Sequence, residues 1–157
     1  MKYPAHIHAD LIPHWILSFC LFGLLVAYNV VCHAWGAQIR IDLDESQRIL
    51  IRSIFYSLAI ILFPVVKLVR HILLRLNLTM PGNQSASRRY WLTVSVTLTL
   101  IEIVGFFGFL MFIFGDGFNT LYIFSLLGGL GLFLNRPKND EYESICAALH
   151  EQPADLD

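Results

Sequence analysis

The chain has 157 residues, of which 56% are hydrophobic and 15% are charged, and its formal net charge at pH 7 is -1. Soluble domains of this length contain fewer apolar and more charged residues, so the composition indicates a small membrane protein. The near-neutral charge gives no general attraction to nucleic acid, and the three cysteines form no CxxC motif that would indicate a zinc site or a disulfide framework.

Two apolar segments occupy the first half of the chain, after a short polar stretch at residues 1–10. Residues 11–35 exceed the roughly 20 residues that cross a bilayer as a helix, and Pro13 suits the first turn of such a helix. The second span is predicted at residues 51–76. Pro64 interrupts it and is expected to bend the helix before it continues as a basic amphipathic stretch near the lipid headgroups.

The second half of the chain has the same arrangement and ends in a polar tail. A linker of small polar residues precedes a third span at residues 90–114, and a Gly-Asp-Gly turn leads to a fourth at residues 118–134. The tail, residues 136–157, contains a predicted helix at residues 139–150. We therefore expect an all-α membrane protein, with a four-transmembrane-helix bundle over residues 11–135 and a short cytoplasmic amphipathic C-terminal helix.

Small residues in the third and fourth spans predict that these two helices pack closely. Gly105 and Gly108 lie in the third span, and Ser125 and Gly129 have small-xxx-small spacing in the fourth. Small side chains let helix backbones approach each other in a membrane, so we expect a tight hairpin.

Lysine and arginine are distributed unequally between the two sides of the predicted bundle. Four spans place both termini and the middle loop on one side, which holds eight of the 11 basic residues: Lys2, Lys67, Arg70, Arg75, Arg88, Arg89, Arg136 and Lys138. The other side holds Arg40, Arg48 and Arg52. Loops rich in lysine and arginine remain on the cytoplasmic side of a membrane. The sequence therefore predicts a multi-pass protein with both termini in the cytoplasm. The small chain and its compact loops favour a bacterial inner membrane.

Glu102 is the one acidic residue in the predicted spans and lies at the middle of the third. A charged carboxylate at this depth costs roughly 2.5–3.5 kcal/mol on insertion scales, so it needs a partner or a proton. Helical spacing places Ser95 and Thr99 on the same face, which we expect to point at protein. The stripe either handles protons or cations or links helices by hydrogen bonds. The second role is preferred, because a proton path usually needs more than one titratable group.

Four further polar side chains are expected at helix interfaces nearer the outer surface. Asn29 and His33 share a face of the first span, and Tyr56 and Ser57 enter the second span at a similar depth. We expect them to form hydrogen bonds between helices.

The predicted C-terminal helix is amphipathic. Asn139 suits its N-cap position. Tyr142, Ile145, Cys146 and Leu149 then recur at i, i+3, i+4 and i+7, which forms one apolar stripe. This stripe is a candidate surface for binding a partner protein.

Histidines near the start of the chain are candidate metal ligands. His6, His8 and His14 precede or begin the first span, and His71 is expected on the same side of the membrane. His14 and His71 can alternatively be pictured as axial haem ligands on adjacent helices. Their spacing matches no specific metal or haem motif, so no cofactor is predicted.

No catalytic motif accompanies these residues, and an enzyme is not predicted. The sequence lacks a P-loop, a GxSxG motif and an HExxH motif. We expect a non-catalytic subunit, assembly factor or protective or regulatory partner of another membrane protein, bound in the lipid bilayer to that protein or to a second copy of itself. The alternatives are a proton- or cation-conducting oligomer that uses Glu102, and a haem- or metal-binding redox protein that uses His14 and His71.

Overall fold

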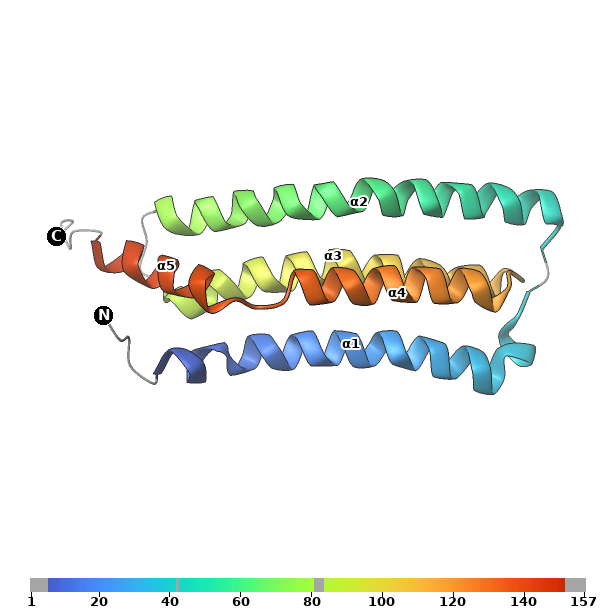
Figure 1. Cartoon of the computed structure of the whole chain (residues 1–157), viewed down its shortest axis with the longest axis horizontal. Helices are drawn as coiled ribbons and strands as arrows, with labels where there is room; N and C mark the ends of the chain where they lie inside the picture. Colours follow the sequence, from blue (N-terminus) through green and yellow to red (C-terminus); the bar gives the residue numbers. More distant parts are fainter. Residues whose placement is uncertain (1–5, 42, 81–83, 152–157) are drawn as a thin grey trace.

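The computed structural model describes residues 6–41, 43–80 and 84–151, and helices occupy nearly all of them. They run in the order α1 (His6–Ile39), α2 (Glu45–Thr79), α3 (Ala86–Ile113), α4 (Phe118–Leu134) and α5 (Asn139–Glu151) (Figure 1). Four helical segments, namely α1, α2, α3 and the stretch formed by α4 and α5, are long and apolar enough to cross a membrane. The predicted all-α chain with four apolar helices is confirmed.

The first two helices extend beyond their predicted spans at both ends. Because α1 begins at His6, Pro13 lies inside the helix and not in its first turn, so that expectation was wrong. Pro64 likewise lies within a single continuous α2. Each proline removes one backbone hydrogen bond, which the long helices on either side of it accommodate.

The centre of the bundle is α3, with α1 and α2 on opposite sides of it (Figure 1). The most apolar window of α3 is 50% buried, against 11% for those of α1 and α2, because α4 also packs along it. One end of the molecule, hereafter the termini end, holds the start of α1, the end of α2 and all of α5. The opposite end, hereafter the hairpin end, holds the α3–α4 turn and the start of α2.

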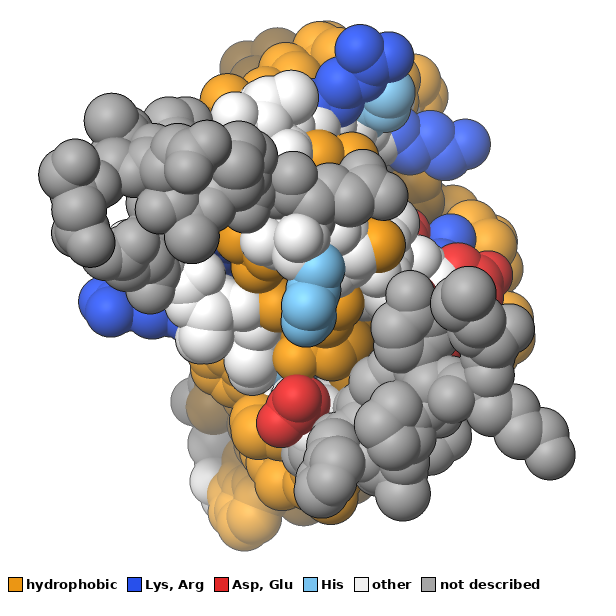
Figure 2. Space-filling view, turned by 90° about the vertical axis from the view of Figure 1, so that its left-hand side faces the viewer, with side chains coloured by type: hydrophobic (Ala, Val, Ile, Leu, Met, Phe, Trp, Pro, Cys, Tyr) orange, Lys and Arg blue, Asp and Glu red, His pale blue; other side chains and the backbone are white. Residues whose placement is uncertain are grey.

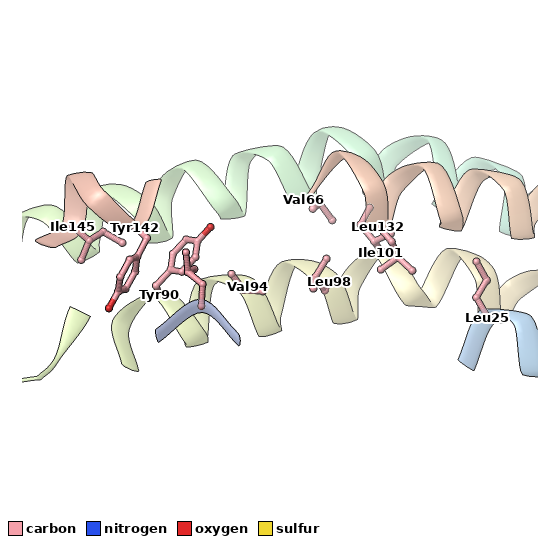
Figure 3. Close-up of a cluster of buried hydrophobic side chains, with 10 residues drawn as sticks. Leu25, Val66, Tyr90, Val94, Leu98, Ile101, Leu132, Tyr142 and Ile145 are labelled. Atoms are coloured by element: carbon pink, nitrogen blue, oxygen red, sulfur yellow. The ribbon is translucent and has the colours of Figure 1, made fainter. Parts of the chain in front are cut away.

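A continuous apolar core runs along α3 from the termini end towards the middle of the bundle (Figure 3). It joins side chains from all five helices: Leu11, Leu25, Val66, Tyr90, Val94, Leu98, Ile101, Leu132, Tyr142 and Ile145. Because α5 contributes to the same core as the long helices, it is an integral part of the bundle.

Glycines allow α3 and α4 to pack as the expected close hairpin. A Cβ atom at Gly108 would lie 2.7 Å from the Cβ of Phe124, and one at Gly128 would lie 3.1 Å from the backbone nitrogen of Gly105. At the turn between the helices, Gly115 has a φ of 87°, a conformation that favours glycine.

The Ser125–Gly129 pair, however, does not form this contact. A Cβ atom at Gly129 would lie 3.5 Å from the Leu25 side chain of α1, and Ser125 accepts a hydrogen bond from Asn29 of α1. The expectation that this pair packs on α3 was wrong, because Gly128 occupies the α3-facing position and its neighbour Gly129 points about 100° away from it.

The outer faces of α1 and α2 expose apolar side chains along most of their length. Phe19 on α1 is 69% exposed and Ile60 on α2 is 72% exposed. In water such continuous apolar faces would favour association, whereas the hydrocarbon interior of a bilayer solvates them. The fold therefore suits four helices that stand in a membrane.

Candidate functional site

The Glu102 carboxyl group lies inside the bundle, although it makes no hydrogen bond there. The residue is 6% exposed, and neither of its side-chain oxygens has a hydrogen-bond partner within the described chain. The Ser95 hydroxyl is buried and unpartnered as well, but Thr99 is exposed. Glu102 points at protein, as expected, but the same expectation was wrong for Thr99. The three residues form no continuous buried path, because the packing of neighbouring helices leaves Thr99 outside.

A dense polar network surrounds Arg70 at the termini end. Its guanidinium group forms a two-point ion pair with Glu141 of α5, in which Nη2 lies 2.6 Å and Nε 3.3 Å from the carboxylate oxygens. Nη1 donates to the Asn135 carbonyl at 2.7 Å, and Nη2 donates to the Arg136 carbonyl at 3.3 Å. Arg70 therefore caps the C-terminal end of α4 and joins α2 to α5.

Tyr90 extends this network from α3. Its hydroxyl accepts a hydrogen bond from the Lys138 backbone N–H at 2.8 Å and donates to Glu141 Oε2 at 3.1 Å. The Tyr90 ring lies 5.8 Å from that of Tyr142, whose hydroxyl donates to Asp10 of α1 at 3.0 Å. The start of α5 is thus tied to α1, α2 and α3.

The apolar stripe of the tail consequently packs on the protein's own helices. Tyr142 and Ile145 are fully buried, and Cys146 and Leu149 pack against the same core. The sequence proposed these four residues as a partner-binding surface. The structure instead uses them to hold α5 against the bundle, so they form no free binding face.

Arginines also converge on the α3–α4 turn at the hairpin end. Arg52 forms a two-point ion pair with Asp116, with Nε 2.8 Å from Oδ2. Arg40, which directly follows α1, and Arg48 of α2 both donate to the Gly115 carbonyl. The turn is therefore held by α2 and by the residue that follows α1.

The interhelical polar candidates divide into two groups. Asn29 donates to Ser125 Oγ at 2.9 Å, and His33 Nε2 lies 2.8 Å from the Tyr122 hydroxyl, so both join α1 to α4. On α2, the Tyr56 ring stacks on Phe124 with ring centroids 4.7 Å apart. The Ser57 hydroxyl is exposed and donates within its own helix, to the Ser53 carbonyl.

The histidines do not come together. His14 is fully buried with its ring 5.3 Å from Trp91 of α3, whereas His71 is exposed on α2, on the other side of α3. The two therefore do not face each other as axial haem ligands would. The side chains of His6 and His8 lie outside the described residues. Among the described residues, no group of three His, Cys, Asp or Glu side chains is arranged to hold a metal ion.

Two apolar cavities lie side by side between α1 and α4, and we call them together the α1–α4 groove. One has a volume of about 720 Å³ and is lined by Asn29, Ser125, Gly129 and apolar neighbours that include Phe22. The other, of about 700 Å³, shares Phe22 and continues towards the termini end, where it is lined by Trp15, Ser18, Phe19, Leu132, Phe133 and Arg136. The groove exists because α1 rests mainly on α3 and only partly covers α4.

The sequence interpretation missed the residues that hold the two ends together. The sequence places Arg70 among the basic residues of one side and Asp116 in a Gly-Asp-Gly turn, and both are buried in the structure. A usable signal was present for Arg70, because Val66, Arg70 and Asn77 recur at i, i+4 and i+11 and share one face of α2. Their partners on α3, α4 and α5 had no such signal in the sequence.

Comparison of the chain with protein-family models, with curated proteins and with solved structures finds no match.

Proposed function

We propose that this chain is a multi-pass membrane protein that binds a transmembrane helix of another membrane protein in the α1–α4 groove. In this role it acts without catalysis, as a subunit, an assembly factor or a protective or regulatory partner. The supporting observation is the groove itself, which is long, apolar and open to the side of the bundle.

The lining of the groove suits a helix better than a lipid chain. Gly129 and Ser125 form its floor one helical turn apart, and Leu126 beside them is 74% exposed. A lipid chain adapts to any apolar surface, whereas a helix backbone gains close contact only over small residues. Asn29 and Ser125 add polar atoms at which a partner's side chain can form hydrogen bonds.

The two other contact surfaces predicted from the sequence, at Glu102 and on the apolar stripe of α5, are not open to a partner. Glu102 is enclosed by its own chain, and the stripe of the tail is packed into its own core. In the groove, by contrast, Ser125 and Gly129 lie beside exposed apolar side chains and are open to the side of the bundle. The distribution of lysine and arginine further supports cytoplasmic termini, in a bacterial inner membrane.

Photocrosslinking in native membranes tests this proposal. A photoreactive amino acid at Leu126, within the groove, is expected to capture a defined membrane protein, which mass spectrometry then identifies. The same probe at Ile60, which is 72% exposed on the outer face of α2, is the control for random encounters. Gly129→Leu fills the groove and is expected to abolish the crosslink and the co-purification of the identified partner.

The outcomes separate the alternatives. Equal crosslinking at Leu126 and Ile60, or none at Leu126, would contradict a specific partner in the groove. Capture of a second copy of this chain would assign the groove to a homo-oligomer and overturn the proposal of a different partner.

The buried Glu102 carboxyl favours a second candidate function, a proton- or cation-conducting oligomer. An acidic residue without a hydrogen-bond partner inside an apolar bundle is costly and is often functional. Purified protein in liposomes should then carry a proton or cation flux that Glu102→Gln abolishes. Absence of flux from the unaltered protein would end this alternative.

A further inference from the structure

A cavity with basic walls, hereafter the basic pocket, lies between α2 and the junction of α4 with α5. Its volume is about 380 Å³. Its polar lining comprises Lys67, Arg70, His71, Asn135, Lys138 and Glu141, and its apolar lining comprises Phe63, Leu74 and Leu134.

The pocket carries an excess of positive charge. Glu141 is the one carboxylate among the described lining residues; it is held by the two-point ion pair with Arg70, and the Lys138 ammonium lies 3.8 Å from it. Lys67 and His71 lie one turn apart on α2, and both are exposed. Figure 2, which looks onto the termini end, shows Lys, Arg and His side chains gathered over the edge formed by α2. An anion that enters the pocket therefore meets at least two lysine ammonium groups.

The pocket lies where the apolar part of the bundle ends. The 17 residues of α4 span about 25 Å, close to the roughly 30 Å hydrocarbon core of a bilayer, and Asn135 follows directly. On α2, the ion-paired Arg52 and Arg70 are about 27 Å apart along the helix axis. In a bundle that spans a membrane, these lengths put the basic pocket at the level of the lipid headgroups.

We propose that the basic pocket binds the phosphate headgroup of an anionic phospholipid. The phosphate lies between Lys67 and Lys138, and the lipid chains follow the apolar surface formed by Phe63 and Leu134. Basic pockets between membrane helices on the cytoplasmic side are suited to anionic headgroups for this electrostatic reason. The proposal rests on the membrane location proposed above and does not depend on the α1–α4 groove.

Such binding would strengthen the attachment of α5. Lys138 directly precedes α5, and Tyr90 and Arg70 already hold this part of the chain through Lys138 and Glu141. A phosphate bound between Lys67 of α2 and Lys138 would add one more contact between α2 and the start of α5. A ligand that binds only the docked arrangement stabilises it.

Lipid titration of the full chain in neutral detergent tests the proposal. Native mass spectrometry is expected to show saturable binding of phosphatidylglycerol and much weaker binding of phosphatidylcholine. Lys67→Gln combined with Lys138→Gln should weaken phosphatidylglycerol binding by about 25-fold, at about fivefold for each lysine near the anionic group. Neither substitution removes a core contact, and an unchanged thermal midpoint without lipid verifies that the variant is folded.

A matched control removes two positive charges at the same end but outside the pocket. Arg75→Gln combined with Arg88→Gln should change the affinity by less than about twofold, because both side chains are exposed and neither lines the pocket. An equal loss in this control would overturn the site in favour of general surface attraction.

Two further measurements complete the test. Equal binding of glycerol 3-phosphate alone would assign the pocket to a soluble phosphate ester and overturn the lipid assignment. Gly129→Leu, which fills the α1–α4 groove, should leave lipid binding unchanged. The proposals for the groove and for the pocket can therefore fail separately.

Discussion

A guanidinium group inside an apolar bundle carries five N–H donors, and Arg70 has an acceptor for each of them. Nε and Nη2 donate to the two oxygens of Glu141, Nη2 also donates to the Arg136 carbonyl, and Nη1 donates to Thr97 and to the Asn135 carbonyl. A lysine has three donors and no planar fork, so it cannot reproduce this set. Glu102 is the opposite case, because it is buried without a hydrogen-bond partner among the described residues and suits its surroundings in the protonated form.

Arg70→Ala is expected to destabilise the protein by about 3 kcal/mol, because it leaves the partly buried Glu141 carboxylate and the α4 carbonyls without their donor. Thermal unfolding in detergent gives the loss of stability, and limited proteolysis reports the release of α5. Arg70→Lys should be intermediate. Arg75→Ala, on the exposed side of the same helix, is the control and should behave like the unaltered protein. Wild-type stability and protection in Arg70→Ala would contradict the role assigned to the network.

At the scale of elements, the α3–α4 hairpin shows how neighbouring glycines take different roles. Gly108 and Gly128 permit close approach of the two backbones, whereas Gly129 faces α1 and the groove. Helical periodicity places small residues on a face, but it does not tell which helix covers that face. The same holds for α5. Its apolar stripe indicates that this face is buried, but the pattern does not tell that it packs on the other helices of the same chain.

Gly108→Ala is expected to destabilise the hairpin by about 1–3 kcal/mol through overpacking against the backbone and the Cβ atom of the facing helix. Gly23→Ala in α1 is the matched control, because an added Cβ there has no neighbour within 4 Å. The control should be neutral or stabilising by up to about 1 kcal/mol from helix propensity. Unfolding in increasing denaturing detergent measures both variants. Equal stability of the two would contradict the packing described for α3 and α4.

At the scale of the whole molecule, an arginine ion pair holds neighbouring elements together at each end of the apolar bundle. Arg52 pairs with Asp116 at the hairpin end, and Arg70 pairs with Glu141 at the termini end. The roughly 27 Å between the two arginines along α2 matches the thickness of a bilayer core. Charged groups therefore gather at two levels, and the exposed surface between them is mostly apolar.

The orientation proposed for the molecule predicts which end faces the cytoplasm. In a chain whose native cysteines are replaced by alanine, a cysteine at Gln84 near the start of α3 should react with a membrane-impermeant maleimide only after the cells are opened. A cysteine at Gln47 near the start of α2 should react in intact cells, once the outer membrane is permeabilised. The reverse pattern would show that the termini lie outside, against the positive-inside rule.

The apolar spans, the short C-terminal helix and the burial of Glu102 were all predictable from the sequence. Each depends on the composition or periodicity of one segment, and about 20 apolar residues in a row have few alternatives to a membrane helix. The partners of Arg70, the exposure of Thr99, the separation of His14 from His71 and the α1–α4 groove were not predictable. These features depend on which helix lies beside which. That choice was decided in the tertiary structure by the close packing of α3 with α4, which placed α1 and α2 on opposite sides of them and left one side of α4 partly uncovered.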